Sequence, residues 1–199
     1  GYRQMGTETG RLSAATPNLQ QVPRSGDFRG LFRARDGYKL VVADFSQVEL
    51  RVAAELSGEE RMLEAYKAGR DLHTETAARM AGIDIEQVNK AQRQSAKVAN
   101  FGLLYGAGPA TLRKQAVAQY GIDMDLDEAK TIVERFRSAY PKLHDWQTEE
   151  GSKTTKAVFT RYGRRRILTG FNDKYTTRIN TQVQGTAGDI AKIAIAMLW

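Results

Sequence analysis

The sequence contains no cysteine in its 199 residues, which excludes disulfide bonds and thiolate metal sites and fits a reducing interior. Long apolar runs are also missing, because no stretch approaches the ~18 residues that a membrane-spanning helix needs. The first residues lack the apolar core of a signal peptide. These absences predict an intracellular, cytoplasmic protein with no membrane partner.

Positive charge is in excess. Lys and Arg number 30 against 23 Asp and Glu, which gives a formal net charge of +7. Hydrophobic residues make up 41% and charged residues 27%, as in soluble globular proteins long enough to bury a core. A basic excess suits a polyanionic partner such as a nucleic acid, but a basic protein without such a partner has the same composition.

The chain divides into an irregular start, a short strand and a long helical middle. Residues 1–35 are rich in Gly, Thr, Ser, Pro and Arg and predict an extended, loop-rich segment. The Val-containing run Tyr38–Phe45 predicts a buried strand. Hydrophobic spacing after Ser46 predicts a helix that ends at Gly58.

Further helices are expected near residues 59–68, 71–81, 84–101, 109–120, 125–139 and 142–156. Residues 157–168 predict a hairpin that turns at Gly163, and a last helix is expected over 176–199. The fold class is therefore α+β, in which a helical segment is inserted between two parts of a sheet-containing unit.

Asp44 follows the apolar run Leu40–Ala43 and is the first candidate ligand for a metal. A carboxylate at the end of a buried strand is held rigidly and remains accessible, which suits a hard divalent cation. Residues of this type at such positions more often cap a helix or lie in a turn. By the same reasoning Glu49 is an ordinary surface residue.

Arg93, Lys97, Phe101 and Tyr105 recur at intervals of four residues. At ~100° per residue they share one face of a helix. Two cations followed by two aromatic rings match a nucleoside triphosphate laid along that face, with phosphates on the cations and the base on a ring. A solvated face with an aromatic anchor has the same pattern.

Four segments together resemble family A DNA polymerases, the bacterial DNA polymerase I type. Asp44–Arg51 (DFSQVELR) resembles motif A, and Arg93–Gly106 is similar to motif B, the nucleotide-binding helix of the fingers. Thr9–Ser13 with Pro17–Gln20 is similar to the segment that contacts the primer–template duplex. Gln184–Ile190 resembles the palm helix after the fingers. The motifs stand in family order and cover nearly the whole chain.

The resemblance implies template-directed addition of deoxynucleotides to a primer 3′ end, with two Mg²⁺ ions as cofactors. Asp44 would ligate both ions, and the Phe45 backbone carbonyl would help to hold one. In such chemistry one ion activates the primer hydroxyl and the other neutralises the triphosphate and the leaving pyrophosphate. Lys97 would protonate that pyrophosphate. Asp44 and Lys97 are therefore the catalytic candidates.

The resemblance also assigns binding roles. The implied nucleotide-binding set is Gln47, Glu49, His73, Arg93, Lys97, Phe101 and Tyr105. Within it Arg93, Lys97 and His73 would meet phosphates, Phe101 would stack beside the base and Glu49 would crowd a 2′ hydroxyl. Phe101 lacks a hydroxyl, which in this family goes with discrimination against dideoxynucleotides. His73 by its residue type alone is a capping or surface histidine.

The implied DNA-binding set is Arg11, Asn18, Gln20, Tyr105, Gly106, Asn180 and Gln184. Along the minor groove, donors of this kind meet acceptors common to every correct base pair, so they sense pair shape. Of Arg164, Arg165 and Arg166, at most two would reach DNA, because three consecutive residues cannot face one way. A structural role is equally consistent. His144 and Trp146 are expected to pack between helices.

The resemblance divides the chain into palm (1–58 and 176–199) and fingers (59–175). The family's His-Asp-Glu motif is not in the sequence, since the only His-Asp pair, His144-Asp145, precedes a tryptophan. We therefore expect a fragment, inactive alone, whose thumb and third motif come from a parent polypeptide or another chain. A nucleoid or viral replication context would suit it.

Two rival functions remain open. The chain could be a non-catalytic subunit that binds DNA and nucleotide and is completed by another chain. It could also be a relative of single-subunit RNA polymerases, although Glu49 argues against the room that a 2′ hydroxyl needs.

Overall fold

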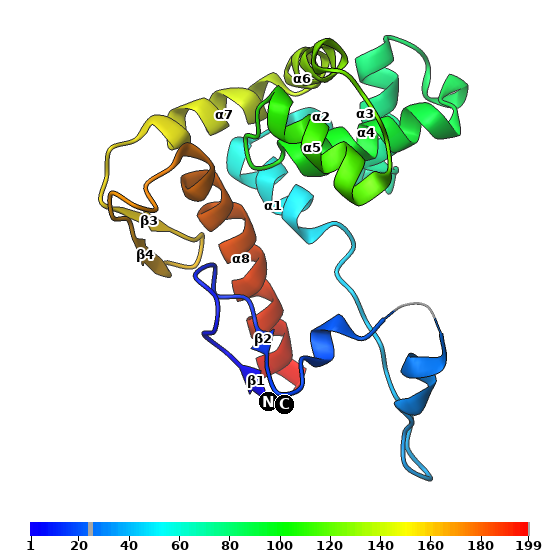
Figure 1. Ribbon diagram of the computed structural model, residues 1–199, viewed down its shortest axis with the longest axis vertical. Helices are drawn as coiled ribbons and strands as arrows, with labels where there is room; N and C mark the ends of the chain where they lie inside the picture. Colours follow the sequence, from blue (N-terminus) through cyan, green and yellow to red (C-terminus); the bar gives the residue numbers. More distant parts are fainter. Residues whose placement is uncertain (24–25, 199) are drawn as a thin grey trace.

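The structure, a computed structural model, describes residues 1–23 and 26–198, so Trp199 of the expected last helix lies outside the described residues. Eight α-helices and two small antiparallel sheets are present in this part of the chain (Figure 1). The helices are α1 (Val48–Ser57), α2 (Glu60–Lys67), α3 (Leu72–Ala81), α4 (Lys90–Leu103), α5 (Pro109–Tyr120), α6 (Leu126–Ala139), α7 (Pro141–Ser152) and α8 (Tyr175–Leu198). The expected α+β class is confirmed.

The strands are short. Strand β1 (Tyr2–Arg3) pairs with β2 (Ser13–Ala14), and β3 (Ala157–Phe159) pairs with β4 (Arg165–Ile167). The second pair is the expected hairpin, and Gly163 adopts a φ of 82° in its turn. Short 3₁₀ turns lie at Leu19–Gln21, Asp27–Leu31 and Ile85–Gln87.

Local capping explains where the helices begin and end. The side chains of Asp71, Asn89 and Asp125 accept hydrogen bonds from backbone N–H groups in the first turns of α3, α4 and α6. Glycines in the left-handed conformation end α1 at Gly58 and α3 at Gly82. The Asn89 cap places the start of α4 at Lys90, later than the expected residue 84, and α7 ends at Ser152 instead of 156.

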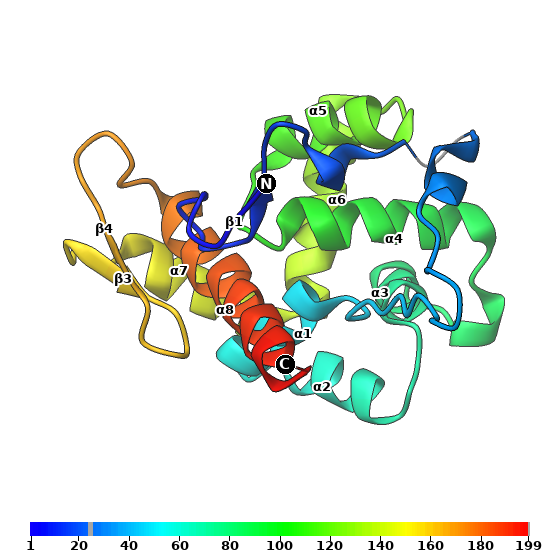
Figure 2. The ribbon, with the colours of Figure 1, turned by 90° about the horizontal axis from the view of Figure 1, so that it is seen from below.

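One hydrophobic core joins the helices. Leu50 of α1, Leu143 of α7 and Ile179 of α8 are each 0% exposed and belong to the same buried cluster as α4 and α6 residues. Small residues such as Ala53 and Ala99 are also fully buried and let the helices approach closely. Figures 1 and 2 show α1 lying beside α8 and α4 lying among α3, α5 and α6.

The prediction of a buried strand over 38–45 is wrong for this structure. Residues 38–45 are assigned to no strand, and Val41 and Val42 are 85% and 87% exposed. The physical reason is that a strand needs a neighbour for its backbone hydrogen bonds, and no described residue pairs with this segment. The apolar run is therefore extended but unburied.

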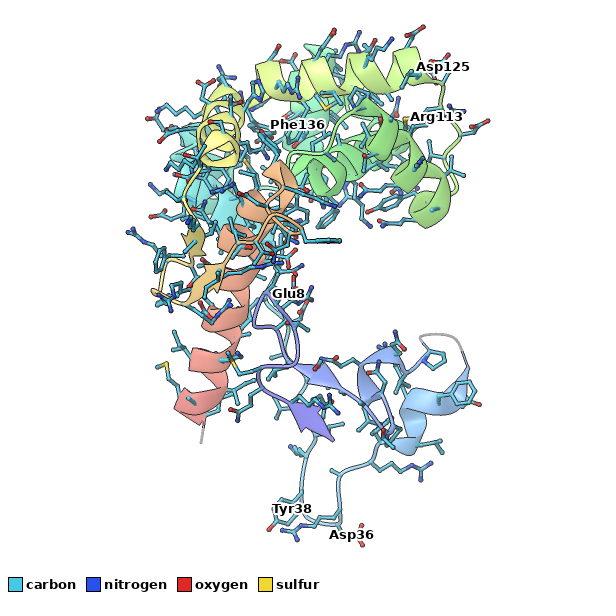
Figure 3. All side chains as sticks on the ribbon, turned by 60° about the vertical axis from the view of Figure 1, so that its left-hand side comes forward. Glu8, Asp36, Tyr38, Arg113, Asp125 and Phe136 are labelled. Atoms are coloured by element: carbon cyan, nitrogen blue, oxygen red, sulfur yellow. The ribbon has the colours of Figure 1, made fainter. Side chains whose placement is uncertain are left out.

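The long helix α8 connects two projecting parts of the molecule. In Figure 3 the helices α3–α6, with Arg113 and Asp125 at their far end, project to the same side of α8 as the segment that carries Asp36 and Tyr38 at its tip. Glu8 lies between these parts, against α8. Within the described residues, no helix has the length and apolar character required to cross a bilayer.

Buried Glu59 connects two helix starts and is a test of this architecture. It is 2% exposed, and its carboxylate accepts hydrogen bonds from the backbone N–H groups of Arg61, Lys142 and Leu143. Glu59→Ala leaves these donors unpaired and should lower the free energy of unfolding by about 2–3 kcal/mol in urea titrations. Glu64→Ala, on the exposed side of α2, should change it by less than about 0.5 kcal/mol. Equal effects would refute the role of Glu59.

Candidate nucleotide and nucleic-acid site

Residues from four distant segments meet around Glu49. Glu49 lies in the first turn of α1, and its carboxylate accepts a hydrogen bond from the Tyr105 hydroxyl, just beyond the end of α4. Arg11 Nη1 of the N-terminal loop lies 3.8 Å from Glu49 Oε1. Gln184 of α8 lies near the Tyr105 hydroxyl. Four residues of the predicted binding sets thus lie together, with Glu49 in contact with Tyr105 and Arg11.

Tyr105 is a neutral hydrogen-bond donor in this cluster. Burial raises the pKa of its hydroxyl, and the hydrogen bond to Glu49 raises the pKa further. Arg11 and Gln184 act in the opposite direction and do not reverse the shift. The tyrosine therefore keeps its proton and holds the Glu49 carboxylate in place.

The entry into α1 is held by Gln47 and Tyr66. Gln47 adopts a left-handed backbone with φ 54°, and its Oε1 accepts a hydrogen bond of 3.0 Å from the Tyr66 hydroxyl. Arg51 Nε donates to the Ser46 carbonyl at 2.9 Å, and its guanidinium lies 4.1 Å from the Tyr66 ring centroid. The backbone immediately after Asp44 and Phe45 is therefore fixed from both sides.

Asp44 itself lies in the extended segment before α1, and its side chain is exposed. A Mg²⁺ ion takes one or two protein carboxylates and completes its shell with water and phosphate oxygens. The exposed Asp44 carboxylate is a group of the kind that such a shell uses. In the residues that the structure describes, no group of three or more His, Asp or Glu side chains could hold an ion.

Three of the four residues predicted to share a face lie on α4, and Tyr105 lies just beyond its end. Arg93 is exposed and donates two hydrogen bonds to Asp71, Nε to Oδ2 at 2.8 Å and Nη2 to Oδ1 at 3.2 Å. The Lys97 ammonium lies 5.9 Å from the Tyr120 ring centroid. Phe101 is packed partly against the core. Neither cation is turned into an apolar interior.

The carboxyl group of Asp71 is strongly acidic. Burial raises its pKa, but the hydrogen bonds that Arg93 and Thr74 donate to the carboxylate outweigh burial and lower the pKa to about 2. Asp71 is also the N-cap of α3 through the Thr74 backbone N–H. It is therefore ionised and rigidly placed at neutral pH.

His73 belongs to a buried chain of hydrogen bonds. It is 4% exposed, its Nδ1 lies 2.9 Å from the Asn100 amide nitrogen, and its ring centroid lies 5.5 Å from that of Phe101. Asn100 and Tyr140 both hydrogen-bond the Thr76 hydroxyl. Burial lowers the pKa of His73, with a smaller contribution from Arg93, so the imidazole is neutral at pH 7.

The remaining DNA-binding candidates lie on two surfaces. Asn18 caps a 3₁₀ turn, and Gln20 Nε2 donates to the Leu12 carbonyl at 3.0 Å, so both side chains brace the N-terminal loop. Asn180 and Tyr105 line a polar cavity of about 400 Å³. The Oδ1 atom of Asn180 is buried without a partner among the described residues. Gly106 has a φ of 76°, which a side chain would strain.

Arg164 and Arg166 have structural contacts. Arg164 Nε donates to Asp189 of α8 at 2.8 Å, and its Nη2 donates to the Thr9 carbonyl. Arg166 pairs with Glu8 and with Thr181 of α8. Since alternate residues of a strand face one way, both hold the N-terminal loop against α8 while Arg165 is exposed.

Close approach explains why a glycine follows Thr9. Gly10 has a φ of 74°, and a Cβ atom there would lie 2.5 Å from the carbon of the Arg164 guanidinium.

Of the expected packing residues, Trp146 lies against the core.

Sequence reasoning missed Asp71 and Asn100 as partners of the site. Each contacts a residue on another helix, so no spacing within one helix signals the contact. The single available signal was the capping pattern Asp71-x-x-Thr74, which gives Asp71 a fixed position but not its arginine.

The fold is similar to that of a polymerase domain. The solved structure described as the POL domain of Pol1 from M. smegmatis in complex with DNA primer-template and dNTP aligns with a TM-score of 0.82 and 29% sequence identity, over 98% of this chain and 36% of that one. The family model for DNA polymerase family A matches residues 1–198. The chain belongs to DNA polymerase family A.

Curated relatives are similar over the same extent. DNA polymerase I of Aquifex aeolicus is 38% identical over 98% of this chain and 34% of its own length. The thermostable DNA polymerase I of Thermus aquaticus is 37% identical over 100% of this chain and 25% of its own length. The chain thus spans about a quarter to a third of these relatives.

The pair between Asp71 and Arg93 should make stability depend on pH. The pKa of Asp71 is lower in the folded chain than the ~3.9 of an unfolded aspartate. The ionised carboxylate therefore adds to the free energy of unfolding above about pH 4, and this contribution is lost as pH falls toward 2. Partial exposure limits this contribution to about 1 kcal/mol. In urea titrations the wild type should have a higher free energy of unfolding than Asp71→Asn at pH 6, and this difference should vanish near pH 2. A difference that does not change with pH would contradict the lowered pKa of Asp71.

Proposed function

We propose that the chain is the nucleotide-binding portion of a DNA-templated DNA polymerase, which adds deoxynucleotides to a primer 3′ end. The observation that carries the proposal is that Glu49 contacts Tyr105 and Arg11, with Gln184 nearby, just beyond the C-terminal end of α4. These residues come from the four segments that resemble the family's motifs. Family membership and the DNA- and dNTP-bound structure of the M. smegmatis relative support it.

The proposed domains follow the packing of the helices. Helix α8 packs on α1, which supports residues 1–58 and 176–199 as a palm, and both helices also pack on α7 of the segment 59–175. Helices α3, α4, α5 and α6 pack on one another, which supports 59–175 as fingers. Because α1 and α4 come from different units in this division, the Glu49–Tyr105 contact bridges them.

In the proposed complex the cations of α4 bind the triphosphate and Phe101 flanks the base. Lys97 donates a proton to the leaving pyrophosphate. His73 offers its remaining nitrogen to the phosphates, since its Nδ1 is engaged by Asn100. Glu49 and Gln47 lie at the sugar, where the anchored Glu49 carboxylate would crowd a 2′ hydroxyl.

DNA binding is proposed along the surface that joins the N-terminal loop to α8. Arg11, Asn180 and Gln184 would face the minor groove, while Asn18 and Gln20 brace the loop that carries Arg11. Tyr105 and Gly106 would adjoin the templating base. The net charge of +7 supports a phosphate-bearing partner.

Asp44 is proposed as a ligand of Mg²⁺, with the Phe45 carbonyl beside it. When bound, the two ions supply the charge stabilisation that phosphoryl transfer requires. The other protein ligands must come from outside the described residues, which supports a requirement for a longer polypeptide or a second chain, thumb included. We propose an intracellular setting.

A non-catalytic DNA- and nucleotide-binding subunit is the second candidate function. One observation favours it, namely that the described residues assemble no acidic metal cluster. A single-subunit RNA polymerase is less well supported, because Arg11 and Tyr105 hold Glu49 where a 2′ hydroxyl would need room.

Nucleotide binding should depend on Lys97. Lys97→Met removes a cation from the proposed triphosphate site and should raise the Kd for a dNTP about tenfold or more, measured by calorimetry on the 199-residue chain. Lys114→Met, which removes an exposed charge from α5, is the matched control and should leave the Kd within about twofold. A dNTP affinity that responds equally to both changes would mean that α4 does not form the site.

The chain alone should bind primer–template DNA without extending it. We expect anisotropy titrations to show binding that weakens as salt rises, because the contacts are to phosphates. Primer extension with Mg²⁺ and four dNTPs should give no product, since Asp44 is the one candidate carboxylate and two ions need further protein ligands. Robust template-dependent extension would overturn the proposed incompleteness, and failure to bind DNA would overturn the polymerase assignment.

A further inference from the structure

Asp71, at the start of α3, holds Arg93 of α4 through hydrogen bonds. Residue spacing within one helix does not reveal this contact, because the two residues belong to different helices. The Asp71 Oδ2 atom accepts hydrogen bonds from the Thr74 N–H at 3.0 Å, the Thr74 hydroxyl at 2.6 Å and Arg93 Nε at 2.8 Å. Its Oδ1 atom accepts from Arg93 Nη2 at 3.2 Å. As the N-cap of α3 the carboxylate is fixed, so any rearrangement of the pair falls to the long arginine side chain.

The pair occupies the part of Arg93 that is best suited to phosphate. A guanidinium binds carboxylate or phosphate through two parallel N–H groups, and Asp71 already uses the edge formed by Nε and Nη2. The side chains are 46% and 35% exposed, so the pair is accessible to a ligand from solvent. A phosphate must either displace Asp71 from this edge or bind to the remaining edge beside a fixed negative charge.

Charge decides which effect of Asp71 dominates. Asp71 orients the arginine, which favours binding, but it also neutralises the arginine and occupies its Nε and Nη2 edge. The attraction lost by neutralising Arg93 grows with each negative charge on the ligand, whereas orientation of one side chain contributes the same amount to every ligand. For pyrophosphate and triphosphates, which carry several charges, the loss of attraction should exceed the gain from orientation.

We infer that Asp71 limits how tightly Arg93 binds polyphosphate, and so sets an upper bound on the affinity of the site for triphosphate and for released pyrophosphate. This inference rests on the proposed function, because it takes Arg93 as a phosphate ligand. Asp71 is a specificity-determining residue that acts through Arg93 and contacts no reacting atom. A site that must release pyrophosphate in each cycle benefits from such a limit.

The test compares the wild type with Asp71→Asn by calorimetry on the 199-residue chain, with pyrophosphate and a dNTP as probes in metal-free buffer. Asparagine keeps the N-cap acceptor, removes the charge and replaces the oxygen that accepts from Arg93 Nη2 by an NH2 group, which cannot accept. We expect about tenfold tighter binding of pyrophosphate at ~50 mM salt, and a smaller gain at ~500 mM salt because the effect is screened. Asp125→Asn, which changes the N-cap of α6 in the same way, should leave both affinities unchanged.

Measuring the effect of Asp71→Asn in an Arg93→Met background tests whether Asp71 acts on pyrophosphate affinity through Arg93 or through the general electrostatic field of its charge. In that background the Asp71→Asn gain should fall to less than about threefold, and an undiminished gain would overturn the link to Arg93. If Asp71→Asn binds pyrophosphate no more tightly than the wild type does, the inference is overturned. The proposed function still stands in that case, provided that the wild type binds a dNTP. If no variant binds a dNTP or pyrophosphate, the proposed function and the inference both fail.

Discussion

The Glu49 carboxylate is the contact on which the arrangement of this chain depends. It receives the Tyr105 hydroxyl from the end of α4 and lies beside Arg11 from the N-terminal loop. One acidic group in the first turn of α1 therefore joins α1, the residue just beyond α4 and the N-terminal loop. Burial keeps Tyr105 protonated, so the donor persists at physiological pH. The cationic face of α4 and the minor-groove candidates are oriented relative to each other through this group.

Much of the helical framework follows from short-range signals. Glycines end helices where the chain must turn left-handed, as at Gly58 and Gly82, and Asp71 and Asp125 begin helices by capping. The common face of Arg93, Lys97 and Phe101 follows from the period of the helix. These features depend on residues within one turn of each other, so sequence spacing is sufficient to predict them.

The rest depends on partners distant in the chain. The run 38–45 has strand composition, but strand formation needs a neighbouring backbone that the described residues do not supply, so hydrophobic pattern alone gave the wrong burial. The bidentate contact of Arg93 with Asp71, and the chain from His73 through Asn100, cross between helices. Side-chain pairs of this kind carry no periodic signature. The resemblance indicated which residues belong to the site but not what holds them.

The anchoring of the N-terminal loop has a consequence for how the molecule forms. Thr9 and its partner Arg164 are separated by 155 positions along the chain. Closing so long a loop is entropically unfavourable until the hairpin and α8 exist as a platform. The helices α1–α7 can assemble from nearer neighbours in the meantime. The surface that carries Arg11 is consequently among the last parts of this chain to reach its final position.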